Sequence, residues 1–487
     1  MEILRCLSGG LAVVATVAIA GLVRADSVKG AEVNRWYMPG PLGQETMPYD
    51  LPLAGEPDFI GRYIYGQEMG EKNGYGGVYT PGGQVWCYLV PPSRYFKRHP
   101  EYYALLDGER VACSPHRGQL CTSNPQVAVI MARKIIRYMD ENPGEIVPIS
   151  PNDNNDFCEC PDCQALDVKP GQLADRLVHF YNQVAAIVEQ KHPDRKMTFL
   201  AYANYTEPPV REKPHRNLIP QICRIEPYSY GISEDRLEKL IQGWCRLSPT
   251  VSTYEYVGDW RWFGFYPMLR DFQRSLQVYK RCGVDIVAAE CHPHWATQGL
   301  NVWVAQRLLW DCDQDLNTLI ADYCKGMYHA AAEPIVRFFN ALEDESWRLN
   351  PNPIYSSKFF NGPLTRELNQ CLVDAEMLAR GDEIALERLQ LLRIGYEFTY
   401  QWSVGWGSFV CWMKDERTRS HLVMAIKRMA RALEIAESVG DAGFQIELVR
   451  QSLNGRKAKQ AKILAEKFPA RPLKENKSWE QKSTAVP

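Results

Sequence analysis

The sequence predicts an α/β protein, a (β/α)₈ (TIM) barrel followed by a C-terminal α-helical module. Eight short segments rich in β-branched and aromatic residues alternate with amphipathic segments between about Pro57 and Trp310. No Gly-rich phosphate-binding loop follows an early strand, which argues against the alternative of an open doubly wound sheet. Strand patterns stop near residue 330, and only helical periodicity continues beyond it.

The composition is that of an ordinary globular protein. The chain has 487 residues, of which 45% are hydrophobic and 23% are charged, and its net charge is −2. This balance does not favour nucleic acid or an anionic membrane surface as a partner. Aromatic residues reach 11%, which suits both sugar stacking and a large core.

The N-terminus is typical of an exported protein. Arg5 precedes a long apolar run, and Val23 and Ala25 stand at the small-residue positions of a cleavage site. We expect residues 1–25 to be a signal peptide with cleavage near Ala25, followed by a linker over 26–56, and we expect a secreted or periplasmic protein. The alternative is an uncleaved membrane anchor, because the run is near the lower length limit for a span.

The expected barrel covers residues 57–329. Helical spacing of apolar side chains predicts helices over residues 171–191, 265–282 and 299–312. The eight expected strands are, in chain order, FIGRYIY, VWCYLVP, GQLCTS, EIVPIS, MTFLAYANY, QICRIEP, VSTYEYV and DIVAAEC.

The C-terminal part reads as a separate helical module over residues 330–470. Three long segments there carry an apolar period of three to four residues, and Gly381 and Gly440 stand where helices are expected to stop. The last residues, 471–487, are polar, and we expect them to be disordered.

A barrel of this type carries its function on the loops that follow the carboxyl ends of its strands. The polar and aromatic residues at those positions are therefore the candidate substrate-binding and catalytic residues. They are Asn152, Asp153, Asn154 and Asp156 after the fourth strand, Tyr202 and Asn204 after the fifth, Glu255, Asp259 and Trp260 at the seventh, and Glu290, His292 and Trp295 at the eighth.

Paired carboxylates beside aromatic side chains are what glycosidic bond cleavage requires. One carboxylic acid protonates the leaving oxygen, and a second carboxylate acts as nucleophile, base or charge stabiliser. Glu290 ends a strand of small apolar residues, so its charge needs a partner or a function. Asp153 occupies the equivalent position after EIVPIS. The structural alternatives are an ion pair for Glu290 and a turn or helix cap for Asp153.

Three cysteines, Cys158, Cys160 and Cys163, follow the Asp153 loop closely. Their spacing is compatible with a structural zinc ion that takes a fourth ligand from elsewhere, such as Cys121, and equally with a disulfide between Cys160 and Cys163. Free thiols are the third alternative. All three make the loop rigid, and none makes these cysteines catalytic.

Several segments together resemble one family. They are HPEYYALLDGER, QLCTSNPQV, ISPNDNNDFCECPDCQALD, ADRLVHFYNQVA, LAYANYTEPP and RLLWDCDQDLNTLIADYCKGMY, and the resemblance runs from about Pro57 to Met327. The family is a bacterial group catalogued as a domain of unknown function, similar to glycoside hydrolase barrels and including exported endo-β-N-acetylglucosaminidases. The resemblance implies a catalytic barrel followed by helices, with acid chemistry at positions that match Asp153 and Glu290.

The sequence departs from this family in two ways. Relatives often carry a small α/β domain before the barrel, whereas only about thirty residues separate the expected signal peptide from the first strand here. Relatives also often have a Gly-His pair entering the segment equivalent to VWCYLVPP, where this chain has Gln84. If that histidine binds substrate, its replacement implies a different substrate or a lost activity.

These observations predict an exported glycoside hydrolase that acts on a carbohydrate next to an N-acetylhexosamine or uronic acid unit, without a cofactor. Two alternatives remain open. A non-catalytic carbohydrate-binding barrel needs the aromatic residues but no carboxylate pair. A metal-dependent hydrolase would use His292 and His294, which form a His-x-His pair beside Glu290.

Overall fold

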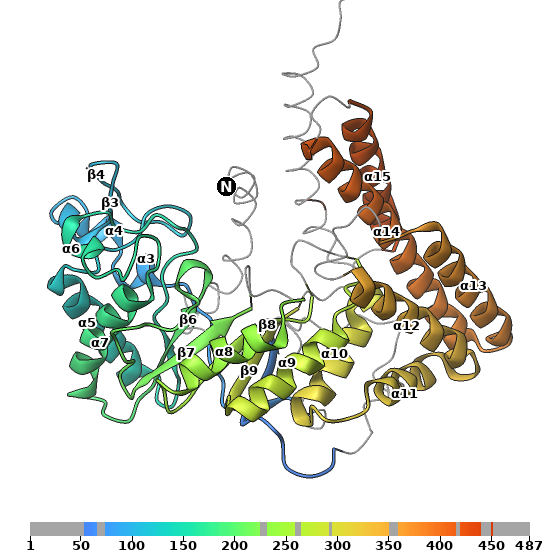
Figure 1. Ribbon diagram of the computed structural model, residues 1–487, viewed down its shortest axis with the longest axis horizontal. Coiled ribbons are helices and arrows are strands. Elements are labelled where there is room, and N and C mark those ends of the chain that lie inside the picture. The colour runs from blue at the N-terminus through green and yellow to red at the C-terminus, as the bar shows by residue number, and fades with distance from the viewer. Residues whose placement is uncertain are drawn as a thin grey trace, which may run out of the picture.

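A mixed α/β core forms the centre of the molecule in the computed structural model. The structure describes residues 53–65, 74–224, 231–258, 264–291, 295–349, 359–414, 419–439 and 450. Figure 1 shows the central sheet between two groups of helices, with the N-terminal lobe on one side and the last four helices on the other. The expected signal peptide (1–25), the expected tail (471–487) and nearly all of the linker lie outside the described residues.

The sheet has seven strands, in the order β2-β1-β9-β8-β7-β6-β5. All neighbours pair in parallel except β2, which lies antiparallel to β1 at one edge. Strands β6 and β7 are buried along their whole length, as expected of a parallel sheet that helices cover. The strand bounds are Gly61–Tyr65 (β1), Gly76–Gly77 (β2), Val147–Pro148 (β5), Met197–Ala201 (β6), Leu218–Cys223 (β7), Ser252–Tyr256 (β8) and Ile286–Glu290 (β9).

The described residues therefore form a curled sheet in which six of the eight expected strands are found, and a complete eight-stranded barrel is not seen among them. The segment VWCYLVP was predicted as a strand, but only its neighbour Gln84 pairs in parallel, with Ser150. The chain then turns into helix α3 (Trp86–Leu89), where the indole N–H of buried Trp86 donates to the carbonyl of Ile149 at 2.7 Å. A short apolar run suits a buried helix as well as a buried strand, which explains the wrong prediction.

The expected strand GQLCTS also lies outside the sheet. Its Leu120 forms an isolated antiparallel bridge with Tyr103. This segment belongs to the N-terminal lobe, which contains the short hairpin of β3 (Leu105–Leu106) and β4 (Glu109–Arg110). The lobe also includes α4 (Pro92–Tyr95), the 3-10 turn η6 (Pro100–Tyr102) and α6 (Pro161–Gln164).

Helices connect most of the parallel strands, and the three helices predicted by spacing are present. They are α7 (Ala174–Glu189), α9 (Leu269–Cys282) and α10 (Trp295–Trp310). The connection from β6 to β7 contains only the 3-10 turn η7 (Ala203–Tyr205). The other helices of this part are α5 (Pro125–Glu141), α8 (Glu234–Cys245) and α11 (Leu316–Tyr328).

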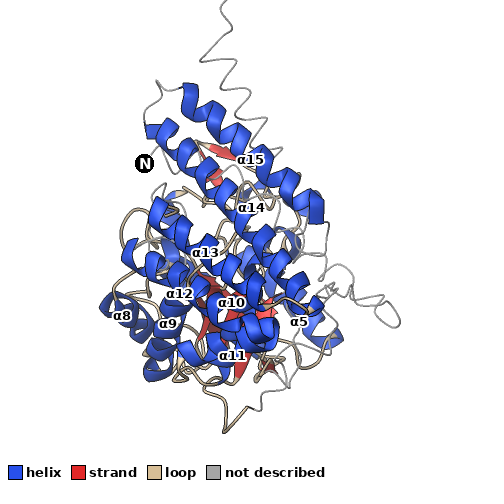
Figure 2. Cartoon of the chain, turned by 90° about the vertical axis from the view of Figure 1, so that its right-hand side faces the viewer, coloured by secondary structure: helices blue, strands red, loops and turns tan. Residues whose placement is uncertain are grey.

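The expected helical module is present after the turn η8 (His329–Ala331). It contains α12 (Ala332–Leu349), α13 (Gly362–Leu378), α14 (Glu383–Lys414) and α15 (Arg419–Val439), which Figure 2 shows in front of the sheet. Gly381 follows α13 with a φ of 90°, as expected of a helix stop, whereas Gly440 lies outside the described residues. Within the described parts of the chain, no helix combines the length and apolar character that a membrane span requires.

Glycine allows a close approach of strands at the sheet edge. A Cβ atom on Gly61 of β1 would lie 2.1 Å from the carbonyl oxygen of Val78, so no larger residue fits without moving the backbone.

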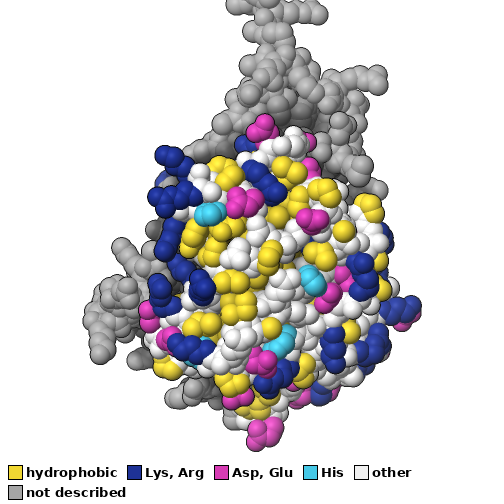
Figure 3. All heavy atoms as spheres, turned by 90° about the vertical axis from the view of Figure 1, so that its left-hand side faces the viewer, with side chains coloured by type: hydrophobic (Ala, Val, Ile, Leu, Met, Phe, Trp, Pro, Cys, Tyr) yellow, Lys and Arg dark blue, Asp and Glu magenta, His cyan; other side chains and the backbone are white. Residues whose placement is uncertain are grey.

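On the face of the N-terminal lobe that Figure 3 shows, Lys and Arg side chains are mixed with Asp, Glu and apolar ones.

Candidate active site

Three of the predicted carboxylates gather near the end of strand β7. Burial raises the pKa of the Cys223 thiol, at the last position of β7, well above its ordinary value, and the negative charges of Glu255, Glu290 and Asp153 raise it further. Glu290 ends β9, Glu255 stands on β8 and Asp153 follows β5, so all three belong to the carboxyl side of one parallel sheet. The carboxyl edge of the sheet therefore brings together residues from β8, β9 and the loop after β5.

Glu290 ends strand β9 and is half-buried. The phenol of Tyr254, on the neighbouring strand β8, donates a hydrogen bond of 2.8 Å to its Oε2 atom. The Tyr254 ring lies against the backbone of Gly82, where a Cβ atom would be only 2.8 Å from the ring. The carboxylate is thus held by a phenol whose own position is fixed by packing, and it can accept a proton or stabilise a positive charge.

Asp153 lies in the loop after β5 and is also half-buried. Burial raises the pKa of its carboxyl above the ordinary value, although a hydrogen bond with Gln84 and the positive charge of His116 act in the opposite direction. A carboxyl that keeps its proton to higher pH is suited to protonate a leaving group. Gln84 is the residue at which this chain departs from the histidine of the family that it resembles.

The polar neighbours of Asp153 bind the protein itself. The Asn152 side chain accepts from the backbone N–H of Cys87 at 3.0 Å and is almost completely buried. Gln119 donates to the backbone oxygens of Asn152 and Asn154, and the N–H of Gly118 donates to Asp156. We expected all three to contact substrate, but in the described structure they fix the loop so that Asp153 is presented.

Glu255 was expected to bind substrate, and the structure places its carboxylate in the interior. It has no exposed surface, it accepts a hydrogen bond from the phenol of Tyr279 on α9, and Arg224 lies 3.9 Å from it. Arg224 also pairs with Asp271 at 3.1 Å. A carboxylate in this buried network acts on a ligand only through its neighbours, by holding β8 and α9 in place.

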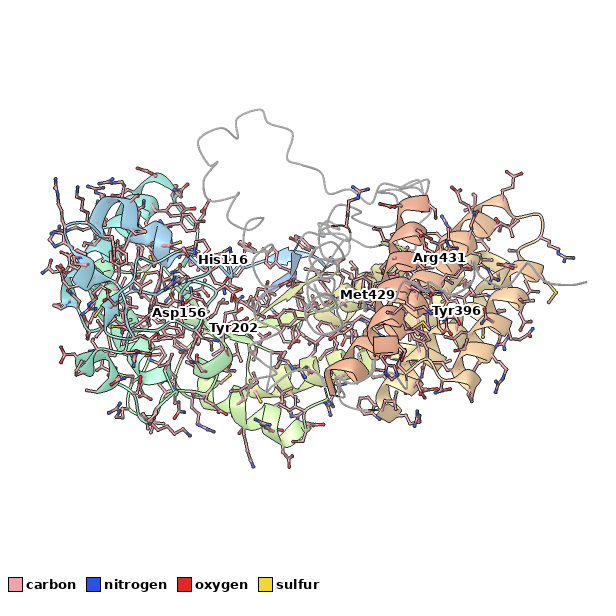
Figure 4. The ribbon with its side chains drawn as sticks, turned by 90° about the horizontal axis from the view of Figure 1, so that it is seen from above. His116, Asp156, Tyr202, Tyr396, Met429 and Arg431 are labelled. Atoms are coloured by element: carbon pink, nitrogen blue, oxygen red, sulfur yellow. The ribbon has the colours of Figure 1, made fainter. Side chains whose placement is uncertain are left out.

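The residues after β6 lie closer to solvent. Tyr202 is half-buried beside Tyr205, with ring centroids 6.2 Å apart, and Asn204 is exposed. Between them Ala203 has a φ of 49°, an unusual backbone conformation that tends to occur at functional sites. Figure 4 shows His116, Asp156 and Tyr202 on the same side of the molecule.

Four of the predicted binding residues cannot be placed. Asp259, Trp260 and His292 lie outside the described residues, and Trp295 begins α10 without a described side chain. They remain predictions. Sequence reasoning missed Tyr254, which stands in the middle of β8. The alternation of VSTYEYV places Tyr254 on the opposite face from Glu255, and this was the available signal.

Two further features lie away from the strand ends. The thiols of Cys121, Cys158, Cys160 and Cys163 are buried together, and all four sulfur atoms lie within 4.8 Å of one another. A pocket of about 290 Å³ in the helical module is lined by residues of α13, α14 and α15. Tyr396 and Arg431 of this pocket lie on the other side of the molecule from His116 in Figure 4, so the pocket is separate from the candidate site.

Among solved structures, two of those that match are glycoside hydrolases. One is a GH138 enzyme targeting pectin rhamnogalacturonan II, with a TM-score of 0.37 and 8% identity over 71% of this chain. The match covers 53% of that enzyme, so the chain spans about half of its length. The other is a mutant of the Thermobaculum terrenum O-GlcNAc hydrolase, with a TM-score of 0.30 and 10% identity over 72% of this chain and 79% of that one. At such low similarity neither structure assigns an activity.

The comparison with protein families is more specific. No curated protein matches the chain. One family model matches residues 58–341, which is more than half of the 487 residues and includes the whole sheet and the loops at its carboxyl edge. The chain therefore belongs to the family described as a domain of unknown function (DUF4838), as its sequence motifs predicted.

Proposed function

We propose that the protein is a glycoside hydrolase in which Asp153 is the general acid and Glu290 is the second carboxylate. The observation that carries this proposal is that both carboxylates stand at the carboxyl ends of strands of one parallel sheet. Asp153 follows β5 and Glu290 ends β9, so each stands two strands from β7, on opposite sides. Both charges nevertheless raise the pKa of the Cys223 thiol at the end of β7, which supports a shared site at the carboxyl edge of the sheet.

The two environments suit different roles. Burial raises the pKa of Asp153, which favours a protonated carboxyl that can donate to the glycosidic oxygen as the bond breaks. Tyr254 donates a hydrogen bond to Glu290, which favours an ionised carboxylate. Glu290 then attacks the sugar carbon, activates water or stabilises the positive charge. If the substrate carries an N-acetyl group, its own amide acts as nucleophile and Glu290 orients it.

The finer assignment rests on the sequence. The N-terminal apolar run supports export, and the resemblance to a group that includes endo-β-N-acetylglucosaminidases supports a glycan with an N-acetylhexosamine unit, or a uronic acid unit, at the cleaved bond. Tyr202 and Asn204 stand near the solvent side of the site and are suited to contact the sugar. We further assign substrate contacts to the predicted residues Asp259, Trp260, His292 and Trp295.

The test compares Asp153→Asn and Glu290→Gln with the unchanged protein on a panel of N-acetylhexosaminides, uronides and N-glycans. We expect each substitution to lower kcat by about 10²- to 10⁴-fold, the usual contribution of a positioned acid or base. Asp194→Asn is the matched control, because Asp194 is an exposed carboxylate in the loop entering β6, at the other end of the sheet.

Turnover that survives both substitutions would overturn the assignment of these carboxylates. Saturable glycan binding without turnover by the unchanged protein would instead support the carbohydrate-binding alternative. Isothermal titration calorimetry on the same glycans distinguishes these two results, because it measures binding whether or not a bond is cleaved.

A further inference from the structure

We propose that Cys121, Cys158, Cys160 and Cys163 bind one structural zinc ion. The sulfur of Cys121 lies 3.8 Å from the sulfur of Cys160 and 3.8 Å from that of Cys163. A tetrahedral zinc ion with four bonds to sulfur of about 2.3 Å separates its ligands by about 3.8 Å. Two of the sulfur separations thus match the spacing that such an ion requires, and all four sulfur atoms lie within 4.8 Å of one another. None of the four cysteines is in a disulfide.

The sequence separation of the four ligands also fits this type of site. Cys160 and Cys163 have the two-residue spacing of a zinc knuckle and flank the start of the short helix α6. Cys158 precedes them by two residues, and Cys121 comes from a distant loop just before α5. Two loops that are far apart in the chain are therefore joined at one point, as in other structural zinc sites.

Hydrogen-bond donors surround the sulfur atoms. The backbone N–H of Leu105 donates to Cys158 at 3.3 Å, and the backbone N–H of Ser123 donates to Cys163 at 3.4 Å. The guanidinium of Arg110 lies 3.7 Å from the Cys158 sulfur. Four thiolates and Zn²⁺ carry a net charge of −2, and N–H donors with one nearby cation stabilise that charge in a buried place.

Part of the lobe packs on the main core through Tyr102, Tyr103 and Leu120. The cysteines form a second cluster, separate from that core, which consists of Ala104 and the four cysteines with Leu105 and Leu106 packed against it. So small a cluster buries too little apolar surface to fix several loops. A metal ion at its centre supplies the missing constraint, as it does in other small folds.

The position of the cluster gives the ion a role at the candidate site. Gln119, two residues before Cys121, holds the backbone of Asn152 and Asn154 on both sides of Asp153. Cys158 follows Asp153 by five residues. Zinc would thus fix both ends of the segment that presents Asp153, but the ion itself is buried and takes no part in the chemistry. The metal site does not depend on the proposed glycosidase activity.

The experiment measures metal in the full chain. Inductively coupled plasma mass spectrometry of the protein, purified under reducing conditions without added metal, should find one zinc ion per chain. Cys160→Ser should lose that zinc, whereas Cys245→Ser, which removes a half-buried cysteine of α8 outside the cluster, should keep it. Titration of the unchanged protein with a mercurial reagent should release the zinc as four buried thiols react, even if Cys160→Ser does not fold.

Three results would overturn the proposal. Protein without zinc, with a mass lower by the hydrogens lost in disulfide formation, would show that the four cysteines form disulfides. Protein without any metal and with four free thiols would show an apolar cluster only. Iron in place of zinc would show that the identity of the metal is wrong. A lower Tm after incubation with a strong chelator, restored by added zinc, would support the proposal independently of any variant.

Discussion

At the scale of single residues, Gln84 contributes to the acidity of Asp153. Its hydrogen bond lowers the pKa of that carboxyl, in opposition to the burial that raises it. We predict that Gln84→Ala raises the pKa of Asp153 further, because the charged form loses a donor. If Asp153 is the general acid, its protonated form persists to higher pH, and the alkaline limb of the kcat/KM profile shifts upward. Steady-state kinetics across a pH series measures this shift.

Gln84→His is the matched control, since histidine restores a donor at the position where relatives often have one. It should return the alkaline limb toward that of the unchanged protein. A shift of the acidic limb in Gln84→Ala would contradict our assignment, because it would mean that Asp153 works in its ionised form and Glu290 donates the proton. A profile that does not move would mean that Gln84 has no part in positioning or tuning the acid.

Residue types and strand ends were sufficient to select Asp153 and Glu290 from the sequence, but not to assign their neighbours. Asn152 and Asn154 are residue types that often bind sugars, so the sequence alone selects them. The three-dimensional structure shows that their hydrogen-bonding groups contact Gln119 and Gly118 of the protein itself. Glu255 alternates with Tyr254 on one strand. The register of the strand decides which of these two side chains lies on the concave face of the sheet. A single sequence does not specify that register.

At the scale of elements, a carboxylate joins the helical module to helix α9. Glu343 of α12 is buried and accepts hydrogen bonds from the backbone N–H groups of Leu269 (3.1 Å) and Arg270 (3.4 Å), the first residues of α9. These N–H groups have no partner within their own helix, so a side chain from another helix satisfies them. Burial raises the pKa of Glu343 to about 7, although these hydrogen bonds and the charge of Arg270 lower it.

This pKa makes stability depend on pH. Folded Glu343 keeps its proton up to about pH 7, whereas the unfolded chain loses it near 4.5, so the folded state binds more protons in that window and stability falls as pH rises through it. Glu343→Gln cannot ionise. We predict that its Tm relative to the unchanged protein rises between pH 4.5 and pH 7.5. The free energy involved is on the order of 3 kcal/mol at most, from about 1.4 kcal/mol per pKa unit.

Differential scanning calorimetry at several pH values tests this expectation. Glu333→Gln is the control, because Glu333 is exposed on the same helix and its substitution should give a difference in Tm that hardly changes with pH. If the difference for Glu343→Gln is equally constant, Glu343 is charged in the folded protein throughout this range.

Elements with a strong hydrophobic pattern were predictable from the sequence. Short elements whose conformation depends on packing against another part of the chain were not. β9 and α9 follow from apolar runs and helical spacing alone. The segment VWCYLVP carries the composition of a strand, but its last residue Pro91, the next residue Pro92 and the burial of Trp86 against Ile149 favour one helical turn. Burial against a specific partner outweighs intrinsic propensity in so short an element.

At the scale of the whole molecule, the helical module reaches the segment that enters α9. Thr399 of α14 is fully buried, and its hydroxyl accepts from the backbone N–H of Phe265 at 2.9 Å. A Cβ atom on Gly264 would be 2.7 Å from the Thr399 side chain, so the two segments are in close contact. Ser346 of α12 donates to the carbonyl of Pro267 at 2.8 Å. In the chain, this segment comes soon after the predicted binding residues Asp259 and Trp260, so we expect the module to support the rim of the candidate site.

Thr399→Val tests whether this support matters for function. Valine keeps the shape but leaves the Phe265 N–H without its acceptor, which costs about 1–3 kcal/mol in a buried place. We predict a lower Tm together with a higher KM for the glycan and a smaller change in kcat, because the substitution disturbs the rim and leaves Asp153 and Glu290 in place. Thr399→Ser keeps the hydroxyl and should retain the KM of the unchanged protein. An unchanged KM in Thr399→Val with a lowered Tm would instead mean that the module stabilises the sheet without shaping the binding surface.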